Sequence, residues 1–198
     1  MAGNTSCEPC VMGAWLSLCK IQGTQKYIAS RFDPEKLDEL ITRLKRFMRC
    51  KYEDPQQPLA ALLSEYGIDF SIMHHFRGAP VQGYICLKPD GTYQMVLTIR
   101  GAYVDRFWFT LFHELGHIIN GDVVKSKEFV DAEENSETER ENNANRFAEN
   151  ALLDAKQYAQ FVECGDYGLG KIQAFAQTQN VPPYVVIGRL QKDEKIPH

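Results

Sequence analysis

Hydrophobic positions repeat with a helical period early in the chain. Asp33 and Pro34 supply an N-cap and a first-turn proline, and apolar residues follow at positions 37, 40, 41, 44, 47 and 48. This pattern predicts an amphipathic helix that ends near Cys50. A second helix is predicted from Pro58 to Tyr66, where Gly67 supplies a C-terminal cap.

The hydrophobic period changes to two after Gly67. The stretch IDFSIM alternates between apolar and polar residues, and YICLK and TYQMVLTI are rich in β-branched and aromatic residues on either side of the turn sequence PDG. Residues 68–100 are therefore predicted to form a small antiparallel β-sheet.

Helical patterns return in the second half of the chain. One helix is predicted from Val104 to Asn120, and others end near Leu153 or occupy residues 155–163, 168–179 and 183–192. The acidic stretch DAEENSETERENN predicts a solvated loop that runs into a helix N-terminus, where negative charge is favourable. The fold class is thus α+β, with an N-terminal helical segment (1–54), a core (55–155) and a C-terminal helical subdomain (156–198).

The composition indicates an ordinary globular protein. The chain has 198 residues, of which 44% are apolar and 24% charged, which predicts one main domain with a small appendage. The net charge of -4 argues against a basic surface for nucleic acid. The N-terminus lacks the pattern of a secretory signal, and the stretch CVMGAWLSLC is too short to span a bilayer, so we expect a cytoplasmic protein.

Six cysteines are scattered along a chain that is long enough to fold without disulfides. We expect reduced thiols. Cys7 and Cys10 form a CxxC pair, which can hold half a zinc site or a redox pair, but no second CxxC completes it. A frayed N-terminal segment with free thiols is therefore favoured over a second metal site.

Candidate chemistry lies in the apolar helical stretch FWFTLFHELGHIIN. His113 and His117 are four residues apart, so both imidazoles project from one helix face and can bind one cation. Glu114 is placed to reach a metal-bound water, as in HExxH metallopeptidases. The alternative is that these histidines are hydrogen-bonded core residues. The spacing, the glutamate between them and the apolar surroundings favour a metal site.

A catalytic zinc site usually has three protein ligands. The next helix has an apolar stripe at Ala144, Ala148, Ala151 and Leu152, and a step back of three residues from Ala144 reaches Glu141. A carboxylate in line with a buried apolar stripe needs an interaction that compensates for its burial, and we predict that this interaction is zinc coordination. Asn145, one turn further on, is either a hydrogen-bond partner of a ligand histidine or an ordinary polar flank.

Two stretches together carry a family resemblance. FWFTLFHELGHIINGD followed by ERENNANRFAENALL resembles the paired signature of the ImmA/IrrE family of metallopeptidases, including its ExxANxFAxxLL pattern. The resemblance implies a zincin-like fold in which the sheet packs on the HExxH helix. It also implies His113, His117 and Glu141 as zinc ligands and Glu114 as the catalytic residue, the same assignment that the helix-face argument gives.

The resemblance extends over roughly residues 14 to 196. FRGAPVQGY, RFWFTLFHELGHI and VVIGRLQKDEKIP are similar to the peptidase-like C-terminal portion of HigA-like antitoxin regulators. In those relatives a helix-turn-helix precedes this region, so we expect either a stand-alone version or part of a longer regulator. The sequence departs from the family where ALLDAKQY replaces a Met-Pro or similar pair after the final leucines.

The predicted function is a zinc endopeptidase in which Glu114 acts as general base and then as general acid. The resemblance implies a helix-turn-helix repressor as the protein substrate. The alternative is a non-proteolytic regulatory or antitoxin-like module that retains zinc. DNA binding by residues 171–193 is disfavoured because YVVIG offers little to bases or phosphates. Candidates for an oxyanion stabiliser stay open among the following polar residues: His74, His75, Tyr84, Arg100 and Tyr103.

Overall fold

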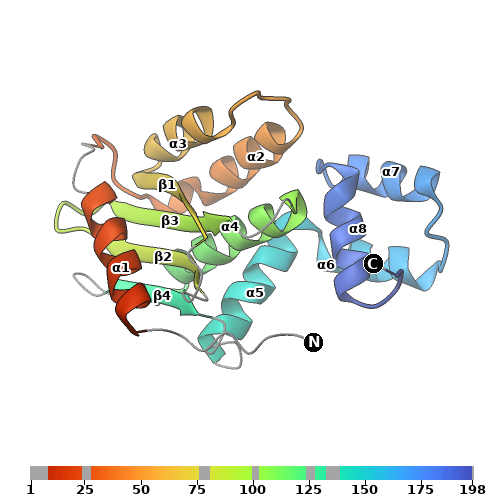
Figure 1. The fold of residues 1–198 in the computed structure, drawn as a ribbon. Coiled ribbons are helices and arrows are strands. Elements are labelled where there is room, and N and C mark those ends of the chain that lie inside the picture. The colour runs from red at the N-terminus through yellow and green to blue at the C-terminus, as the bar shows by residue number, and fades with distance from the viewer. Residues whose placement is uncertain are drawn as a thin grey trace.

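Four strands form one mixed sheet in the order β1-β3-β2-β4 (Figure 1). The computed structural model describes residues 9–23, 28–75, 81–99, 103–123, 128–132 and 139–197. The strands are β1 (Ile68–His74), β2 (Val81–Leu87), β3 (Tyr93–Ile99) and β4 (Glu128–Ala132). The helices are α1 (Pro9–Gly23), the 3-10 turn η1 (Pro34–Lys36), α2 (Leu37–Met48), α3 (Gln56–Ser64), α4 (Val104–Ile119), α5 (Glu139–Leu152), α6 (Ala155–Glu163), α7 (Leu169–Thr178) and α8 (Pro183–Lys192). The predicted α+β class is confirmed.

The prediction of a purely antiparallel sheet is wrong. Strands β2 and β3 form the predicted antiparallel hairpin, but β1 pairs with β3 in parallel. Alternating apolar residues identify a strand but do not indicate which strands lie next to it. The position of β3 between β1 and β2 therefore has no signal in the sequence. Strand β4 was also not predicted. It pairs antiparallel with β2 at the sheet edge, and it includes the first two residues of the predicted acidic loop.

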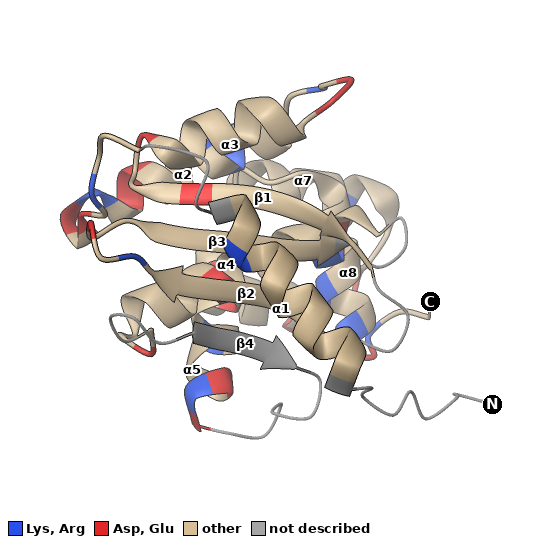
Figure 2. Cartoon of the chain, turned by 60° about the vertical axis from the view of Figure 1, so that its left-hand side comes forward, with Lys and Arg blue, Asp and Glu red and all other residues tan. Residues whose placement is uncertain are grey.

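Helices cover both faces of the sheet. On one face, Phe112 and Leu115 of α4 belong to a core cluster that includes Ile85 of β2 and Met95 of β3. On the other face lies α1, which crosses the strands in both views (Figures 1 and 2). Trp15 of α1 is fully buried there against the ring of Tyr84. The sheet therefore separates a large core around α4 from a small one under α1.

Local turn chemistry sets the ends of the predicted helices. The Asp33 side chain accepts a hydrogen bond from the backbone N–H of Glu35, as an N-cap does. Gly67 and Gly121 both have positive φ at the ends of α3 and α4, where they act as left-handed C-terminal caps, the role predicted for Gly67. The three-part division of the chain stays a prediction, although one core cluster extends from Leu40 of α2 to Leu190 of α8.

The C-terminal helices pack against the same core. Val185, Val186 and Leu190 of α8 are buried in the cluster around α4, so the apolar YVVIG stretch contributes to the core. Of the cysteine pair, Cys7 lies outside the described residues, and Cys10 is an exposed free thiol in the first turn of α1. Within the described ranges, no helix is long and apolar enough to cross a membrane.

Candidate metal centre

Helix α4 presents both histidines of the HELGH stretch on its buried side. His113 and His117 lie one helical turn apart, and their ring centroids are 4.7 Å apart. His117 is fully buried, and His113 is 5% exposed. Because burying an uncompensated polar group is costly, each ring nitrogen needs a partner.

Helix α5 brings a carboxylate to the two imidazoles. Its buried residues are Glu141, Ala144, Ala148 and Leu152, which is the predicted stripe, apart from the half-buried Ala151. Gly116 allows the close approach of α5, because a Cβ at that position would lie 2.9 Å from the backbone Cα of Ala144. The small residues at the crossing therefore set how near Glu141 comes to α4.

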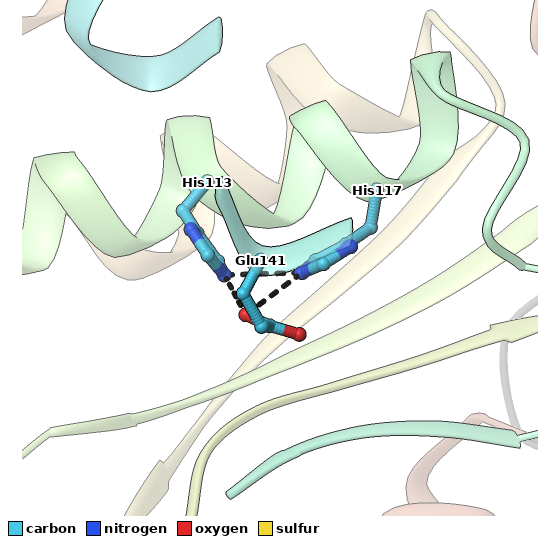
Figure 3. A group of neighbouring side chains, drawn as sticks. All are labelled: His113, His117 and Glu141. Carbon is cyan, nitrogen blue, oxygen red and sulfur yellow. Dashed lines mark hydrogen bonds and ion pairs between the residues drawn. The ribbon is translucent and has the colours of Figure 1, made fainter. Parts of the chain in front are cut away.

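The three side chains converge on one point (Figure 3). Oε2 of Glu141 lies 3.1 Å from Nε2 of His113 and 3.5 Å from Nε2 of His117. The two Nε2 atoms are 3.0 Å apart. Among the described residues, these three form the one group of His, Cys, Asp and Glu side chains with metal-site geometry. Glu139 lies on an exposed face, whereas Glu133, Glu134 and Glu137 lie outside the described residues.

The outer nitrogen of each ring contacts an oxygen. Oδ1 of Asn145, one turn after Glu141, lies 3.0 Å from Nδ1 of His113. Oδ2 of Asp122 lies 2.9 Å from Nδ1 of His117. An ionised carboxylate only accepts hydrogen bonds, so Nδ1 of His117 donates, and its Nε2 carries a lone pair when the ring is neutral. Nδ1 of His113 likewise donates to the Asn145 oxygen.

This donor set fits a cation. With both rings neutral, two Nε2 lone pairs and a carboxylate oxygen face one another at short range, and they repel unless a proton or a metal ion lies between them. Imidazole nitrogen and carboxylate oxygen are ordinary ligands of zinc and related divalent metals. This cluster could therefore hold a metal ion.

Sequence reasoning did not single out Asp122, although a signal for it exists. Gly121 turns the chain at the end of α4, where the N–H of Gly121 donates to the carbonyl of Ile118 and the N–H of Asp122 donates to that of His117. This reversal brings the side chain that follows the glycine back beside the last turn of the helix. An acidic residue directly after a helix-ending Asn-Gly pair can therefore reach a histidine in the preceding turn.

The environment of the cluster holds Glu141 ionised. Burial raises the pKa of Glu141, but the hydrogen bonds to His113 and His117 outweigh it and lower the pKa to about 2. Burial lowers the pKa of His117, and the hydrogen bonds to Glu141 and Asp122 outweigh it and raise that pKa above the usual value. A proton on His117 and a metal ion would compete for the same lone pair, so any metal bound at this cluster would be held less tightly as the pH falls.

Glu114 lies in a space that Gly83 of β2 leaves open. The carboxylate is fully buried, and a Cβ on residue 83 would overlap its Oε1 atom. A glycine inside a strand often marks the close approach of another group, as it does here. Gly83 is a second residue that sequence reasoning missed, because the contact joins β2 to a helix that follows more than twenty residues later.

The polar candidates for an oxyanion stabiliser are dispersed. His74 and His75 are exposed at the end of β1, and Tyr103 is exposed at the start of α4. Tyr84 is buried beneath α1 on the opposite face of the sheet from Ile85 and α4. Arg100 lies outside the described residues. The structure brings none of the four described candidates into the His113, His117 and Glu141 cluster.

A buried glutamate that follows the first of two histidines on one helix, together with a carboxylate from the adjacent helix, is typical of metal-dependent peptidases. Comparison with known families agrees: residues 83–191 match the peptidase family M78, described as the IrrE N-terminal-like domain. The match covers more than half of the chain, so this protein belongs to that family, and the resemblance to the ImmA/IrrE family is confirmed. Peptidases of this family are metal-dependent. Among curated proteins, none matches the sequence.

Proposed function

We propose that this protein is a zinc-dependent endopeptidase with a zincin-like core, and that His113, His117 and Glu141 are its zinc ligands. The observation that carries the proposal is the convergence of Nε2 of His113, Nε2 of His117 and Oε2 of Glu141 within hydrogen-bonding range of one another. Three protein ligands leave a coordination position open for water or substrate, as in catalytic rather than structural zinc sites.

Zinc bound there supplies Lewis-acid chemistry, polarising a peptide carbonyl and lowering the pKa of water to about 7. We assign Glu114 as the acceptor of the attacking water's proton, because it directly follows the first proposed ligand histidine in the HELGH stretch. It then donates that proton to the leaving amine. Asn145 and Asp122 accept hydrogen bonds from the Nδ1 atoms of His113 and His117. These bonds favour the tautomer with the proton on Nδ1, which leaves a lone pair on the inward-facing Nε2.

The space that Gly83 leaves for the Glu114 carboxylate favours an enzyme over a regulatory module with a purely structural metal. A structural site has no use for a proton acceptor beside an open coordination position. We propose a transcriptional repressor with a helix-turn-helix as the protein substrate. Support for this substrate comes from the resemblance to the ImmA/IrrE family alone.

Metal analysis and proteolysis test the proposal together. We expect the purified full-length protein to contain about one zinc ion per chain and to cleave a helix-turn-helix repressor encoded beside its gene. Treatment with 1,10-phenanthroline should remove the metal and stop cleavage, and added zinc should restore it. Equal cleavage by the metal-free protein would contradict the proposal.

Replacement of Asp122 by asparagine is expected to weaken zinc binding by about 10- to 100-fold, the usual effect of losing a hydrogen-bond partner of a ligand histidine. The amide is neutral and makes His117 a weaker base. The measurement is a competition titration with a chelating dye at constant pH. The control is Glu53→Gln, which removes one exposed carboxylate in the loop before α3. Equal affinity in the two variants would exclude this role for Asp122.

A further inference from the structure

A cavity of about 450 Å³ lies between α4, α5 and α8. This volume is within the range of about 300–1,000 Å³ that is usual for ligand pockets. Its inner wall includes the buried apolar side chains of Leu152, Leu153 and Val185, together with the half-buried ring of Phe109. The cavity therefore offers an apolar interior.

The cavity adjoins the metal centre along three elements. On α4, Phe109 of the cavity wall precedes His113 by one turn, and the two ring centroids are 6.2 Å apart. On α5, Glu149 of the cavity rim follows Asn145 by one turn. On β2, Gln82 of the cavity is the direct neighbour of Gly83. The cavity thus begins one helical turn from His113 on α4 and one turn from Asn145 on α5.

A bulge in β2 supplies the polar group at this boundary. Val81 pairs with Ala132 of β4 and Gly83 pairs with Asp131, so Gln82 is the extra residue on β2. Val81 consequently joins the small core under α1, and Gln82 lines the cavity instead. Bulges of this kind re-aim side chains next to active sites.

Three of the five charged side chains that line the cavity are paired with one another, whereas the half-buried Asp105 and the exposed Arg106 do not belong to this network. Glu149 bonds to Lys192 at 3.0 Å and to Arg189 at 3.3 Å. Arg189 also bonds to Asp193 at 2.8 Å, and the Lys192 ammonium lies 4.5 Å from the Phe109 ring centroid. Because the interior is lined by the buried side chains of Leu152, Leu153 and Val185, a charged ligand group that enters it would be desolvated at high cost.

We propose that this cavity is a substrate subsite that binds one bulky apolar side chain, such as Leu or Phe, next to the scissile bond. The inference rests on the proposed peptidase function, because the cavity lies beside its metal centre. Burial of a large apolar side chain is favourable there, whereas Asp or Lys is excluded by desolvation. Phe109, Leu152, Leu153 and Val185 are specificity-determining residues in this assignment, and Gln82 lies at the boundary with the reacting bond.

Binding to an inactive protein tests the subsite without any cleavage. The protein is the zinc-loaded full chain with Glu114→Gln, and the probes are labelled decapeptides of Gly, Ser and Ala with one central Leu, Phe, Ala or Asp. We expect the Leu and Phe peptides to bind at least about tenfold more tightly than the Ala and Asp peptides. The methyl NMR signals of Leu152, Leu153 and Val185 should shift on binding. Equal or undetectable binding of all four peptides would overturn the subsite.

Two filled variants, Thr110→Met on α4 and Val185→Phe on α8, should abolish the preference for Leu and Phe. Each is first shown to be folded by circular dichroism, and two different walls are used so that one misfolded variant does not decide the test. Gln160→Phe on the exposed side of α6 is the matched control and should retain the preference. A preference that survives in both folded filled variants contradicts the assignment.

Cleavage of a mixed peptide library by the active protein separates the two proposals. We expect Leu or Phe at one position beside the scissile bond, and a shift toward Ala or Gly in the filled variants. Cleavage with an unchanged profile would refute the subsite and leave the peptidase function standing. Apolar binding that depends on the cavity, without any cleavage, would refute the peptidase function and the place beside a scissile bond, and would leave the cavity as an apolar binding site only.

Discussion

Replacement of Glu114 by glutamine is expected to reduce peptide-bond cleavage by at least about 100- to 10,000-fold while zinc binding is retained. Glutamine has nearly the same shape as glutamate, so it fits the space beside Gly83, but its amide does not accept the proton of the attacking water. The ligand atoms of His113, His117 and Glu141 are unchanged. The measurement is the cleavage rate of the repressor substrate together with the zinc content.

Glu163→Gln is the control for this experiment, because it removes an exposed carboxylate at the end of α6. It should cleave at the wild-type rate. Unchanged proteolysis in Glu114→Gln would reject the assigned base. Loss of zinc from that variant would show instead that Glu114 is a ligand, which contradicts the assignment of Glu141 as the third one.

The helices of the metal centre were predictable because their information is local. The four-residue spacing of His113 and His117 fixes their common face in any helix, and the apolar stripe of α5 reaches Glu141 by the same arithmetic. The two predicted faces meet in the structure because α4 and α5 pack face to face through Gly116 and Ala144. The three residues of the cluster could therefore be identified from the sequence without knowledge of any tertiary contact.

The arrangement of the sheet was less accessible. The parallel pairing of β1 with β3 and the bulge at Gln82 depend on which strands become neighbours, and an alternating pattern does not encode that choice. Gly83 belongs to the same class, because only the packing of β2 on α4 reveals what a side chain there would meet. Asp122 differs from these residues, since the Asn-Gly turn before it marks its position.

The sheet and the two helices thus have separate tasks in the site. In the proposed enzyme, helices α4 and α5 would supply the atoms that bind the cation, whereas β2 determines where the Glu114 carboxylate lies and contributes Gln82 to the adjoining cavity. A change in β2 should therefore impair catalysis while metal binding remains. A substitution at Gly83 is therefore the best test, outside the cluster, of whether catalysis and metal binding can be separated.

Replacement of Gly83 by alanine is expected to lower the cleavage rate by about 100-fold, since a displacement of about 1 Å in a catalytic group has an effect of that size. The new methyl group would overlap the Glu114 carboxylate, which is fully buried. The strand cannot easily retreat, because Gly83 pairs with Leu97 on β3 and with Asp131 on β4. Zinc content should stay at the wild-type level.

A double-mutant cycle identifies the cause of this loss. Gly83→Ala should destabilise the wild-type protein by about 1–3 kcal/mol, as overpacking does. In a Glu114→Ala background the carboxylate is absent and the methyl group has room, so the same change should cost clearly less free energy of unfolding. Gly170→Ala is the control, because a Cβ at that exposed position of α7 has no atom within 4 Å. Equal destabilisation by Gly83→Ala in both backgrounds would show that the strand itself, rather than the contact with Glu114, requires glycine.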